Sequence, residues 1–472
     1  MTASPRFDYP RVLIFGVGFD AYSGGGITLS NLFRGWPVSR LAVAEATARD
    51  DNSTVACAEY RLGELEQRWV WPLSLVPRHR EPSGPIDHSD RAMDRAPGGG
   101  VPGEGAVLTA RAAGTRTAQA VFHRAVGRLG MAEVLQRSTL SAPLRAWVQG
   151  FSPDVIYCQL ASLHTIRLVR DLHEWSGAKV VVHIMDDWPE TIYGRALLGP
   201  WMRARVDREF RDLLSRAAVR MAISQAMANE YLARYGFEFA VFHNCIDVAW
   251  WRESRKTSWA LAPPLRVVYS GRIGWDALAS FRDFCEAIEL MNQRGLPAQF
   301  RIHSPGLDTP GAAALAGYPH TVMLPAVEPE QLRGVLTGAD VLVIPSDFEG
   351  LGRRFARLSM PTKVPAYMAS GTPVLLYSPR THAMCAWAEQ AKWAVVVGNR
   401  SPEQLAQALT RLAVSPTLRE SLGRRASEMA DREFDGRRVR VAFRDALAGF
   451  SRDEGREADC AENPAAGGDR PV

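Results

Sequence analysis

Short apolar runs alternate with amphipathic stretches along almost the whole chain. Runs such as RVLIFGVG (11–18) and DVLVIPS (340–346) are apolar on both faces, which is typical of strands in a sheet that helices cover on both sides. Between them, stretches such as FRDFCEAIELMNQRG (281–295) repeat apolar residues at helical spacing. The pattern predicts strands at residues 11–18, 40–46, 154–160, 179–186, 219–224, 239–245, 265–271, 299–304, 321–326, 340–346, 373–379 and 394–399. We therefore expect an α/β protein with two doubly wound, Rossmann-like domains that face each other across a cleft.

The domain boundary is predicted at a polar segment that ends in two prolines, ESRKTSWALAPP (253–264). Two other segments lack periodicity and are rich in Gly, Pro or charge, so we predict disorder there. The predicted units are an N-terminal domain (1–258) with a disordered insertion (78–118), a C-terminal domain (259–435), a helix that packs back on the N-terminal domain (436–450) and a disordered tail (451–472).

Composition excludes several function classes. The 56 basic and 51 acidic residues leave a net charge of only +5 on 472 residues, which gives no support for a nucleic-acid partner. The six cysteines are scattered and form no C-x-x-C pair, so we expect free thiols and no metal site. No apolar run approaches the roughly 20 residues of a membrane span, and the N-terminus lacks an apolar signal core. We expect a cytoplasmic protein.

One segment allows contact with the inner face of a membrane. Residues 120–151 carry arginines interleaved with Val, Leu, Met and Trp, a composition that suits an anionic membrane surface. The alternative is a basic-faced helix that packs on its own sheet.

Two glycine clusters follow the first predicted strand. The first reads G-x-G-x-x-A, but the glycines that come after it interrupt any helix beginning there, so the helix is predicted to begin near Ile27. Gly24, Gly25 and Gly26 then lie at a helix N-terminus, where backbone amides suit a phosphate or a sugar. A bare structural turn is one alternative. A nicotinamide site, with Glu45 at the end of the second strand, is another.

A second loop with potential phosphate ligands lies within residues 339–379. A strand that ends at Ser346 leads into an irregular loop and then a short helix, which we expect Ser359 and Pro361 to open and Gly371 to close. Ligands of open α/β sheets bind at this carboxyl edge. Positive charge is supplied there by Arg353, Arg354 and Lys363. A solvated basic face is the alternative.

The stretch SMPTKVPAYMASGTPVL (359–375) resembles the nucleotide-binding segment of GT-B-fold glycosyltransferases of the family-four (group 1) type, particularly those of bacterial surface-polysaccharide pathways. Other segments resemble the family's glycine loop, its approach to the hinge and the start of its donor domain: SGGGITLSNLFRGWP (23–37), RMAISQAMANEYLARYG (220–236) with FHNCID (242–247), and VVYSGRIGW (267–275). The resemblance covers nearly all of the chain except the predicted insertion and tail.

This resemblance implies transfer of a sugar from a nucleotide diphosphate donor to a glycan, lipid-linked or small-molecule acceptor, by a hexosyltransferase-type, retaining enzyme without metal or cofactor. Arg272 and Lys363 would neutralise the leaving diphosphate, and His183 would face the donor sugar. The implied donor-binding residues are Gly24, Gly25, Gly26, Glu349, Arg353, Ser359, Pro361, Thr362 and Tyr367. On the acceptor side or in the cleft we expect Asp186, Asn244 and Asp247.

Several of these residues also have a structural interpretation. His183 fits a buried core histidine, and Asn244 and Asp247 fit a turn. We expect Asp187 to cap a helix that has Pro189 and Glu190 in its first turn. Two departures from the family pattern motivate a second hypothesis, a catalytically degenerate nucleotide-binding or scaffold protein. Ala366 stands where the family commonly has a ribose-binding glutamate. The lysine that the family has a few residues after the arginine is missing, since the residues after Arg272 read IGWDALASF.

Overall fold

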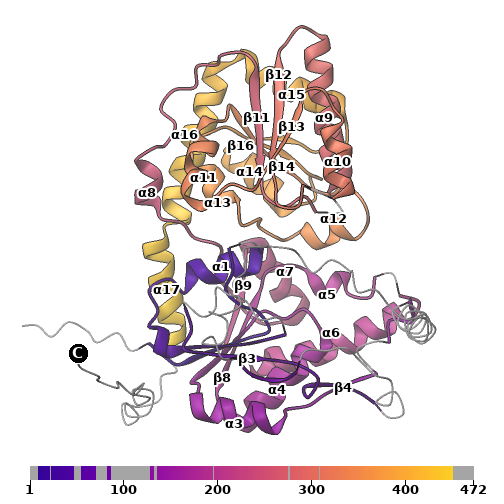
Figure 1. Cartoon of the computed structure of the whole chain (residues 1–472), viewed down its shortest axis with the longest axis vertical. Helices are drawn as coiled ribbons and strands as arrows, with labels where there is room; N and C mark the ends of the chain where they lie inside the picture. Colours follow the sequence, from indigo (N-terminus) through magenta and orange to yellow (C-terminus); the bar gives the residue numbers. More distant parts are fainter. Residues whose placement is uncertain are drawn as a thin grey trace, which may run out of the picture.

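The computed structural model describes residues 9–21, 23–46, 55–70, 82–86, 128–131, 135–194, 196–274, 277–307 and 309–449. The predicted disordered insertion lies almost wholly outside these residues, and the predicted tail lies outside them entirely. The described chain forms two Rossmann-like domains, as the apolar pattern predicted (Figure 1).

The N-terminal domain is built on an eight-stranded sheet in the order β10-β9-β8-β7-β1-β2-β3-β5. Its strands pair in parallel except β3 with β5. In chain order they are β1 (Val12–Phe15), β2 (Leu41–Glu45), β3 (Ala58–Arg61), β5 (Gly84–Pro85), β7 (Val155–Cys158), β8 (Lys179–Ile184), β9 (Val219–Ala222) and β10 (Ala240–Val241), with β4 (Gln67–Trp69) and β6 (Gln136–Ser138) forming a separate antiparallel pair.

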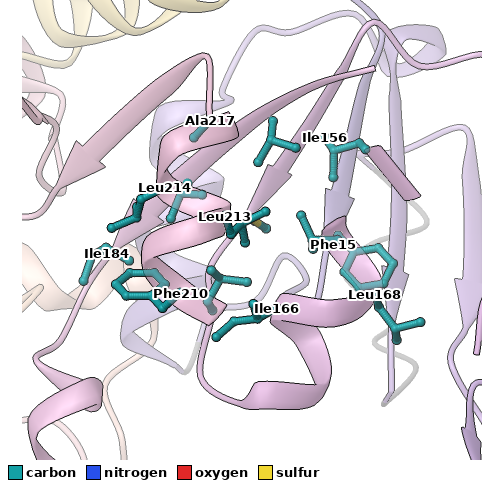
Figure 2. Close-up of a cluster of buried hydrophobic side chains, with 14 of the residues drawn as sticks. Phe15, Ile156, Ile166, Leu168, Ile184, Phe210, Leu213, Leu214 and Ala217 are labelled. Carbon is teal, nitrogen blue, oxygen red and sulfur yellow. The ribbon is translucent and has the colours of Figure 1, made fainter. Parts of the chain in front are cut away.

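Helices cover both faces of this sheet. They are α1 (Gly24–Leu32), the 3-10 turn η1 (Val38–Arg40), α3 (Ala142–Phe151), α4 (Leu163–Ser176), α5 (Trp188–Thr191), α6 (Gly199–Arg216) and α7 (Gln225–Tyr235). The next helix, α8 (Val248–Arg252), packs against the C-terminal domain. Apolar residues of α3, α4, α6 and α7 pack on one face. Figure 2 shows part of that core, where Phe210 and Leu213 of α6 and Phe15 of β1 belong to one cluster.

The C-terminal domain has a six-stranded, fully parallel sheet in the order β13-β12-β11-β14-β15-β16. Its strands are β11 (Leu265–Ser270), β12 (Ala298–His303), β13 (Thr321–Leu324), β14 (Val341–Pro345), β15 (Val374–Tyr377) and β16 (Ala394–Val397). Its helices are α9 (Leu278–Gln293), α10 (Pro310–Ala316), α11 (Pro329–Gly338), α12 (Gly350–Ala356), α13 (Val364–Ala369), α14 (Ala383–Ala391), α15 (Pro402–Val414) and α16 (Pro416–Glu433). One face packs on α9, α10 and α15, and the other on α11, α13, α14 and α16.

The chain crosses between the domains twice. The first crossing runs through α8 and residues 253–264, where Arg419 of α16 holds the carbonyl of Trp259 at 2.6 Å. The second leads from α16 into α17 (Gly436–Ala448), whose Phe443 and Leu447 are buried in the N-terminal core beside α1. The two crossings pair with each other, since Gly436 N donates to Ile246 O at 2.8 Å. In Figure 1, α17 lies against α1 of the lower domain.

The segment predicted for membrane contact is not one helix. Within residues 120–151 the described chain forms β6 and α3, and residues 120–127 and 132–134 lie outside the described part. The apolar side chains of α3, Leu144, Val148 and Phe151, are buried in the N-terminal core. The face of α3 therefore follows the alternative prediction, a helix that packs on its own sheet.

Candidate active site

Residues that follow strands of both sheets meet at the junction between the domains. The hydrogen bonds that cross it include Ser359 Oγ to Asp186 Oδ1 (2.8 Å), Asn244 Nδ2 to Thr362 O (2.8 Å) and Ser224 Oγ to Leu358 O (2.7 Å), with the first-named atom as donor in each. Segment 357–363 of the C-terminal domain thus lies against the strand ends of the N-terminal domain. In open α/β sheets these edges are where ligands bind.

Lys363 brings a positive charge to this junction. Its Nζ donates a hydrogen bond to Tyr269 OH at 2.6 Å and lies 3.9 Å from the centre of the Tyr269 ring. A Cβ at Gly271 would fall 2.6 Å from the ammonium, so only glycine there leaves room for Lys363 at the end of β11. Burial lowers the pKa of Lys363 to about 7. No carboxylate among the described residues pairs with it.

Arg272 is joined to Lys363 through Tyr269. The Tyr269 hydroxyl donates to the carbonyl of Arg272 at 2.7 Å while it accepts from Lys363. The Arg272 side chain is exposed. The backbone of Arg272 therefore belongs to the same group of contacts as the Lys363 ammonium, while the Arg272 guanidinium is exposed. Cations after β11 and before α13 suit a diphosphate.

Tyr367 stabilises this arrangement from the core of the C-terminal domain, and its side chain does not face a ligand. Its side chain is buried, and its hydroxyl accepts from Ser270 N at 2.8 Å and lies 3.2 Å from Ser270 O. The hydroxyl thereby fixes the last residue of β11. The predicted donor contact of Tyr367 is wrong, because the side chain is enclosed in the core of the C-terminal domain.

The short helix begins later than predicted. Val364 N donates to Pro361 O at 3.0 Å, so Pro361 opens a turn, and α13 begins at Val364 with Lys363 at its N-cap. The proline was expected at the first helical position. Its half-buried ring instead lies in the connecting segment, between Ser359 and Thr362, whose contacts cross the junction.

The glycine loop lies on the other side of the same segment. Helix α1 begins at Gly24, three residues before the predicted start, because Ser23 caps it and accepts from Gly26 N at 3.0 Å. Ser23 is itself held by the Asp20 carboxylate, which a Cβ at Gly26 would meet. A Cβ at Gly24 would lie 3.5 Å from the Thr362 side chain. The start of α1 therefore lies beside the segment that carries Lys363.

Asp186 supplies a carboxylate where the domains meet. It follows β8, is half-buried and accepts from Ser359 Oγ at 2.8 Å. Burial raises the pKa of Asp186 to about 6, although the Ser359 hydrogen bond acts in the opposite direction. A carboxyl group with this pKa changes charge close to neutral pH, which suits a group that binds an acceptor hydroxyl.

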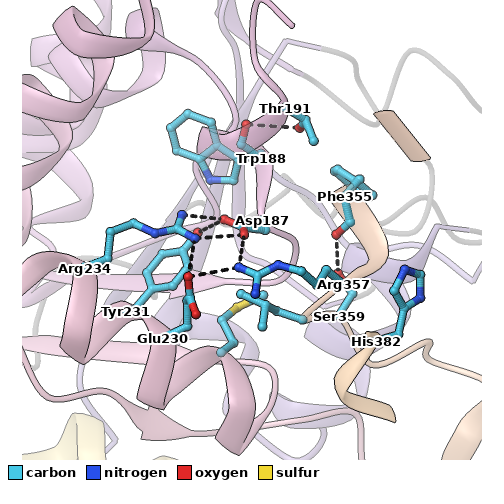
Figure 3. A network of polar contacts seen from close by, with 12 residues as sticks. Asp187, Trp188, Thr191, Glu230, Tyr231, Arg234, Phe355, Arg357, Ser359 and His382 are labelled. Carbon is cyan, nitrogen blue, oxygen red and sulfur yellow. Dashed lines mark hydrogen bonds and ion pairs between the residues drawn. The ribbon is translucent and has the colours of Figure 1, made fainter. Parts of the chain in front are cut away.

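Asp187 has a different role from the predicted helix cap. It precedes α5, but its side chain forms no cap hydrogen bond. The buried carboxylate instead accepts from Arg234 Nη1 (2.8 Å), Arg234 Nη2 (3.1 Å) and the hydroxyl of Tyr231 (3.1 Å). Arg357 of the C-terminal domain lies 3.7 Å from Asp187 and donates to Glu230 at 3.0 Å (Figure 3). These ion pairs fasten segment 357–363 to the N-terminal domain.

His183 does not reach a ligand, so the predicted catalytic role of its side chain is wrong. The ring is fully buried, with Nδ1 2.6 Å from Tyr157 OH and Nε2 2.9 Å from Phe242 O. Burial lowers the pKa of His183 to about 4, so the ring is neutral at pH 7. Nε2 must donate to the Phe242 carbonyl, which leaves Nδ1 to accept from Tyr157.

Gln159 is a candidate that the sequence interpretation missed. Tyr157 OH, which donates to His183, accepts from Gln159 Nε2 at 3.3 Å, so this chain of bonds fixes the amide orientation. The carbonyl oxygen of Gln159 then faces Gly25, where an added Cβ would lie 2.8 Å from it. The signal was present, since Gln159 is a polar residue at the end of a predicted apolar strand.

Asn244 and Asp247 make different kinds of contact in the structure. Asn244 joins both domains, since it accepts from Asn31 Nδ2 of α1 at 2.9 Å and donates to Thr362 O. Asp247 caps α8 and accepts from Trp250 N at 3.2 Å. This contact is the structural role that the alternative interpretation gives to Asp247.

Two further predicted residues lie on α12 or at its start, away from these contacts. Arg353 is exposed on the helix. Glu349 precedes the helix, pairs with Arg400 at 3.7 Å and lines a cavity of about 60 Å³ together with Ser280 and Phe348. The structure therefore brings Lys363, Arg272, Asp186 and Asn244 to the junction, and it places Glu349 at a separate small cavity.

Within the residues that the structure describes, no three His, Cys, Asp or Glu side chains come together as a metal site. In the same residues, no helix has both the length and the apolar character of a membrane span.

Two family models match the chain. "Glycosyl transferases group 1" matches residues 264–415, and "Glycosyltransferase Family 4" matches residues 105–250. The chain belongs to the family-four (group 1) glycosyltransferases. It is therefore a glycosyltransferase that takes its sugar from a nucleotide sugar. No curated protein sequence matches this glycosyltransferase.

Solved structures align with the glycosyltransferase over nearly its whole length. The structure of Anabaena HepE in complex with UDP covers 93% of this chain and 100% of its own, at 11% identity and a TM-score of 0.57. Its complex with UDP-glucose covers 93% and 99%, at 12% identity and a TM-score of 0.57. Sucrose-phosphate synthase from Thermosynechococcus elongatus covers 93% and 99%, at 12% identity and a TM-score of 0.56. These similarities confirm the GT-B fold.

Proposed function

We propose that this glycosyltransferase transfers a hexosyl group from a nucleotide diphosphate sugar without a metal ion and with retention of configuration. The observation that carries the proposal is the ammonium of Lys363, which is half-buried at the domain junction beside Arg272 and has no carboxylate partner among the described residues. A buried cation without a counter-ion is costly unless an anion joins it. A diphosphate supplies that anion.

The donor is proposed to bind mainly to the C-terminal domain. Its diphosphate would lie between Lys363, Arg272 and the first amides of α1, where Gly24 and Gly25 allow close approach. Of the complexes with similar folds, those of HepE contain UDP and UDP-glucose, which makes uridine nucleotides the first to test. The identity of the base is left to that test.

The acceptor is proposed to meet Asp186 and Asn244 of the N-terminal domain. In the transfer, the bond between the anomeric carbon and the diphosphate oxygen breaks, and a bond from that carbon to the acceptor oxygen forms. The acceptor proton passes to the departing diphosphate, so the enzyme needs no covalent nucleophile. Asp186 orients the acceptor hydroxyl as a hydrogen-bond acceptor. A glycan, a lipid-linked sugar or a small molecule satisfies this chemistry.

The proposed compartment is the cytoplasm. The five cysteines that the structure describes, Cys57, Cys158, Cys245, Cys285 and Cys385, are free thiols. Free thiols are usual in a reducing compartment.

The second hypothesis is a degenerate member that binds nucleotides or partners without transfer. It rests on Ala366, which packs against the core of the C-terminal domain and offers no carboxylate to a ribose. A scaffold would keep the fold while losing the donor.

Protection against thermal unfolding distinguishes the two. We expect one nucleoside diphosphate among UDP, GDP and ADP to raise the melting temperature, and the matching nucleotide sugar to do the same. Hydrolysis or transfer of the sugar, followed by release of the nucleoside diphosphate, would then establish turnover. A folded protein that binds none of the three nucleotides would overturn the transferase proposal. A protein that binds a nucleoside diphosphate, but does not release it from the nucleotide sugar in the presence of any acceptor class, would favour the degenerate member.

A further inference from the structure

The side chain of Gln159 lies at the end of a series of hydrogen bonds that begins in the core of the N-terminal domain. His183 Nε2 lies 2.9 Å from Phe242 O, and His183 Nδ1 lies 2.6 Å from Tyr157 OH. Gln159 Nε2 lies 3.3 Å from the same Tyr157 hydroxyl. Tyr157 and His183 are fully buried, whereas Gln159 is half-buried. The series therefore joins the core to an amide that is partly exposed.

The direction of every bond in this series is fixed. Burial lowers the pKa of His183 to about 4 and raises the pKa of Tyr157 above its usual range, so the ring is neutral and the hydroxyl keeps its proton. Because Nε2 of the ring donates to a carbonyl, Nδ1 carries no proton and accepts from Tyr157. The Tyr157 oxygen can then only accept from Gln159. The NH2 group of Gln159 is therefore turned toward Tyr157, and its carbonyl oxygen is turned away.

The carbonyl oxygen of Gln159 faces the start of α1. An added Cβ at Gly25 would lie 2.8 Å from this oxygen. On the other side of the same turn, an added Cβ at Gly24 would lie 3.5 Å from the Thr362 side chain, next to Lys363. No group in the described part of the chain donates a hydrogen bond to the Gln159 carbonyl oxygen. The fold thus holds an acceptor in one direction without using it.

The order of the strands places Gln159 between the two proposed substrate sites. Strand β7 lies between β8 and β1, and both neighbours pair with it in parallel. Gln159 directly follows β7, whereas Asp186 follows β8 and the glycine loop (24–26) follows β1. Asp186 is proposed for the acceptor, and the start of α1 for the donor diphosphate. The transferred sugar must lie between them, because its anomeric carbon leaves the diphosphate oxygen and joins the acceptor oxygen.

We propose that the carbonyl oxygen of Gln159 accepts a hydrogen bond from a hydroxyl of the transferred sugar, and that Tyr157, held by His183, is the positioning residue for this contact. The inference rests on the proposed transfer and adds a residue that selects the sugar. A carbonyl oxygen accepts hydrogen bonds and donates none. A sugar that lacks a hydroxyl at this position is therefore bound less tightly. His183 acts on the site through its tautomer, although its ring contacts no ligand.

The affinities for the nucleotide sugar and for its nucleoside diphosphate test the proposal. The sugar is the one that best protects the protein against thermal unfolding, with UDP-glucose measured first. In calorimetry, Gln159→Ala should lower the affinity for the nucleotide sugar by about tenfold. It should leave the affinity for the nucleoside diphosphate unchanged, because the contact is to the sugar. Gln149→Ala, which removes an exposed glutamine of α3, is the control and should bind both compounds as the wild type does.

Monodeoxy analogues of the same nucleotide sugar identify the hydroxyl. The wild type should bind one analogue about tenfold more weakly than the parent sugar. Gln159→Ala should bind that analogue and the parent equally, because a single contact is lost only once. Tyr157→Phe keeps the ring but lets the Gln159 amide rotate, so it should weaken the parent sugar by about threefold and leave the analogue unchanged. A purely structural role of Tyr157 would weaken both equally.

Two results would overturn this inference alone. The first is an equal loss of affinity for the nucleotide sugar and the nucleoside diphosphate in Gln159→Ala. The second is the same preference among the analogues in Gln159→Ala and in the wild type. Wild-type discrimination by Tyr157→Phe would overturn the positioning role. Absence of any nucleoside diphosphate binding by the wild type would overturn the proposed transfer as well, so the two failures are distinguishable.

Discussion

The ammonium of Lys363 lies 2.6 Å from the hydroxyl of Tyr269 and 3.9 Å from the centre of its ring. The aromatic face and the hydroxyl stabilise the charge partly, but burial still lowers the pKa of Lys363 to about 7. The junction thus holds a cation that is prepared for an anion. The proposed function depends on this relationship.

Replacement of the Lys363 side chain should weaken binding of the nucleotide donor. We expect Lys363→Ala to lower the affinity for the preferred nucleoside diphosphate by about ten- to a hundredfold, since charge-assisted hydrogen bonds contribute about 1.5–3 kcal/mol. Isothermal titration calorimetry measures the affinity. Lys179→Ala, which removes an exposed lysine at the start of β8, is the control and should leave the affinity unchanged. Equal affinity of Lys363→Ala and the wild type would remove Lys363 from the phosphate site.

Above pH 7, the protein should take up a proton when it binds a nucleotide. The pKa of Lys363 in the folded protein, about 7, is below its ordinary value of 10.5, so the unfolded chain holds the proton more tightly. The stability of the nucleotide-free protein should therefore rise as the pH increases from about 7 to 10.5, and the full cost of the buried charge is present below pH 7. A bound diphosphate favours the charged lysine and reverses the shift.

Calorimetry at pH 8 in buffers of different ionisation enthalpy measures how many protons are taken up per nucleotide bound. The wild type should take up a fraction of a proton per nucleotide, and Lys363→Arg, which stays charged, should take up none. The affinity of the wild type should also decrease as the pH rises above 7. Identical proton uptake in both proteins would assign the proton to another group.

Asp186 should produce the acid limb of the pH–rate profile. Its pKa is raised from 3.8 to about 6, so the folded protein binds a proton more tightly than the unfolded chain does between these values. Stability should fall as the pH rises through this window, while kcat/KM should rise toward a plateau above pH 6 as the carboxylate forms.

Two variants separate the charge from the hydrogen bond. Asp186→Asn still accepts from Ser359, but it should lose the acid limb and raise the KM for the acceptor. Ser359→Ala removes the bond that lowers the pKa, so the acid limb should move to higher pH. An unchanged acid limb in Asp186→Asn would show that a different group titrates.

Gly25 should be required for binding although alanine is the better helix former. An added methyl at Gly25 would lie 2.8 Å from the Gln159 carbonyl oxygen and displace it. We expect Gly25→Ala to lower nucleotide-sugar affinity or raise the acceptor KM by about tenfold, while helix propensity alone favours alanine by about 1 kcal/mol. Gly150→Ala in α3, which meets open space, is the control and should leave kinetics unchanged. Wild-type kinetics in Gly25→Ala would exclude Gln159 from the site.

The ion pairs of Asp187 with Arg234 and with Arg357 should contribute unequally to the free energy of unfolding. Arg234→Ala removes two hydrogen bonds from a buried carboxylate, and we expect a loss of about 3–5 kcal/mol. Arg357→Ala removes a 3.7 Å contact with Asp187 and a 3.0 Å hydrogen bond to the partly exposed Glu230, and it should cost about 1 kcal/mol. Thermal and urea unfolding measure both, with the exposed Arg216→Ala as a near-neutral reference. A larger loss for Arg357 than for Arg234 would contradict this ordering.

The sheets could be predicted because apolar runs are a local property. All twelve predicted strands are present, but the pattern missed β3, β4, β5 and β6, which are short and carry polar residues such as Glu59 and Arg68. Helix starts were misplaced by three residues at Gly24 and Val364. At Gly24 the Asp20–Ser23 contact advances the start of α1, and at Val364 a turn from Pro361 delays the start of α13.

The site residues were harder to predict because their roles depend on distant partners. The sequence around Asp187 predicts a local helix cap, yet its carboxylate pairs with Arg234, 47 residues away. A strand that is apolar on both faces does not reveal which side chains face the junction, so His183 was placed there although its ring lies in the core. Lys363 was identified because its segment carries the family resemblance, whereas the Tyr269 contact that positions it becomes visible only in the folded chain.

The most direct measurement is a crystal structure of the protein with its preferred nucleoside diphosphate. The account predicts diphosphate oxygens within hydrogen-bond distance of Lys363 Nζ, with the Arg272 side chain turned toward them and the start of α1 beside them. A nucleotide bound at full occupancy whose diphosphate contacts neither Lys363 nor Arg272 would contradict it.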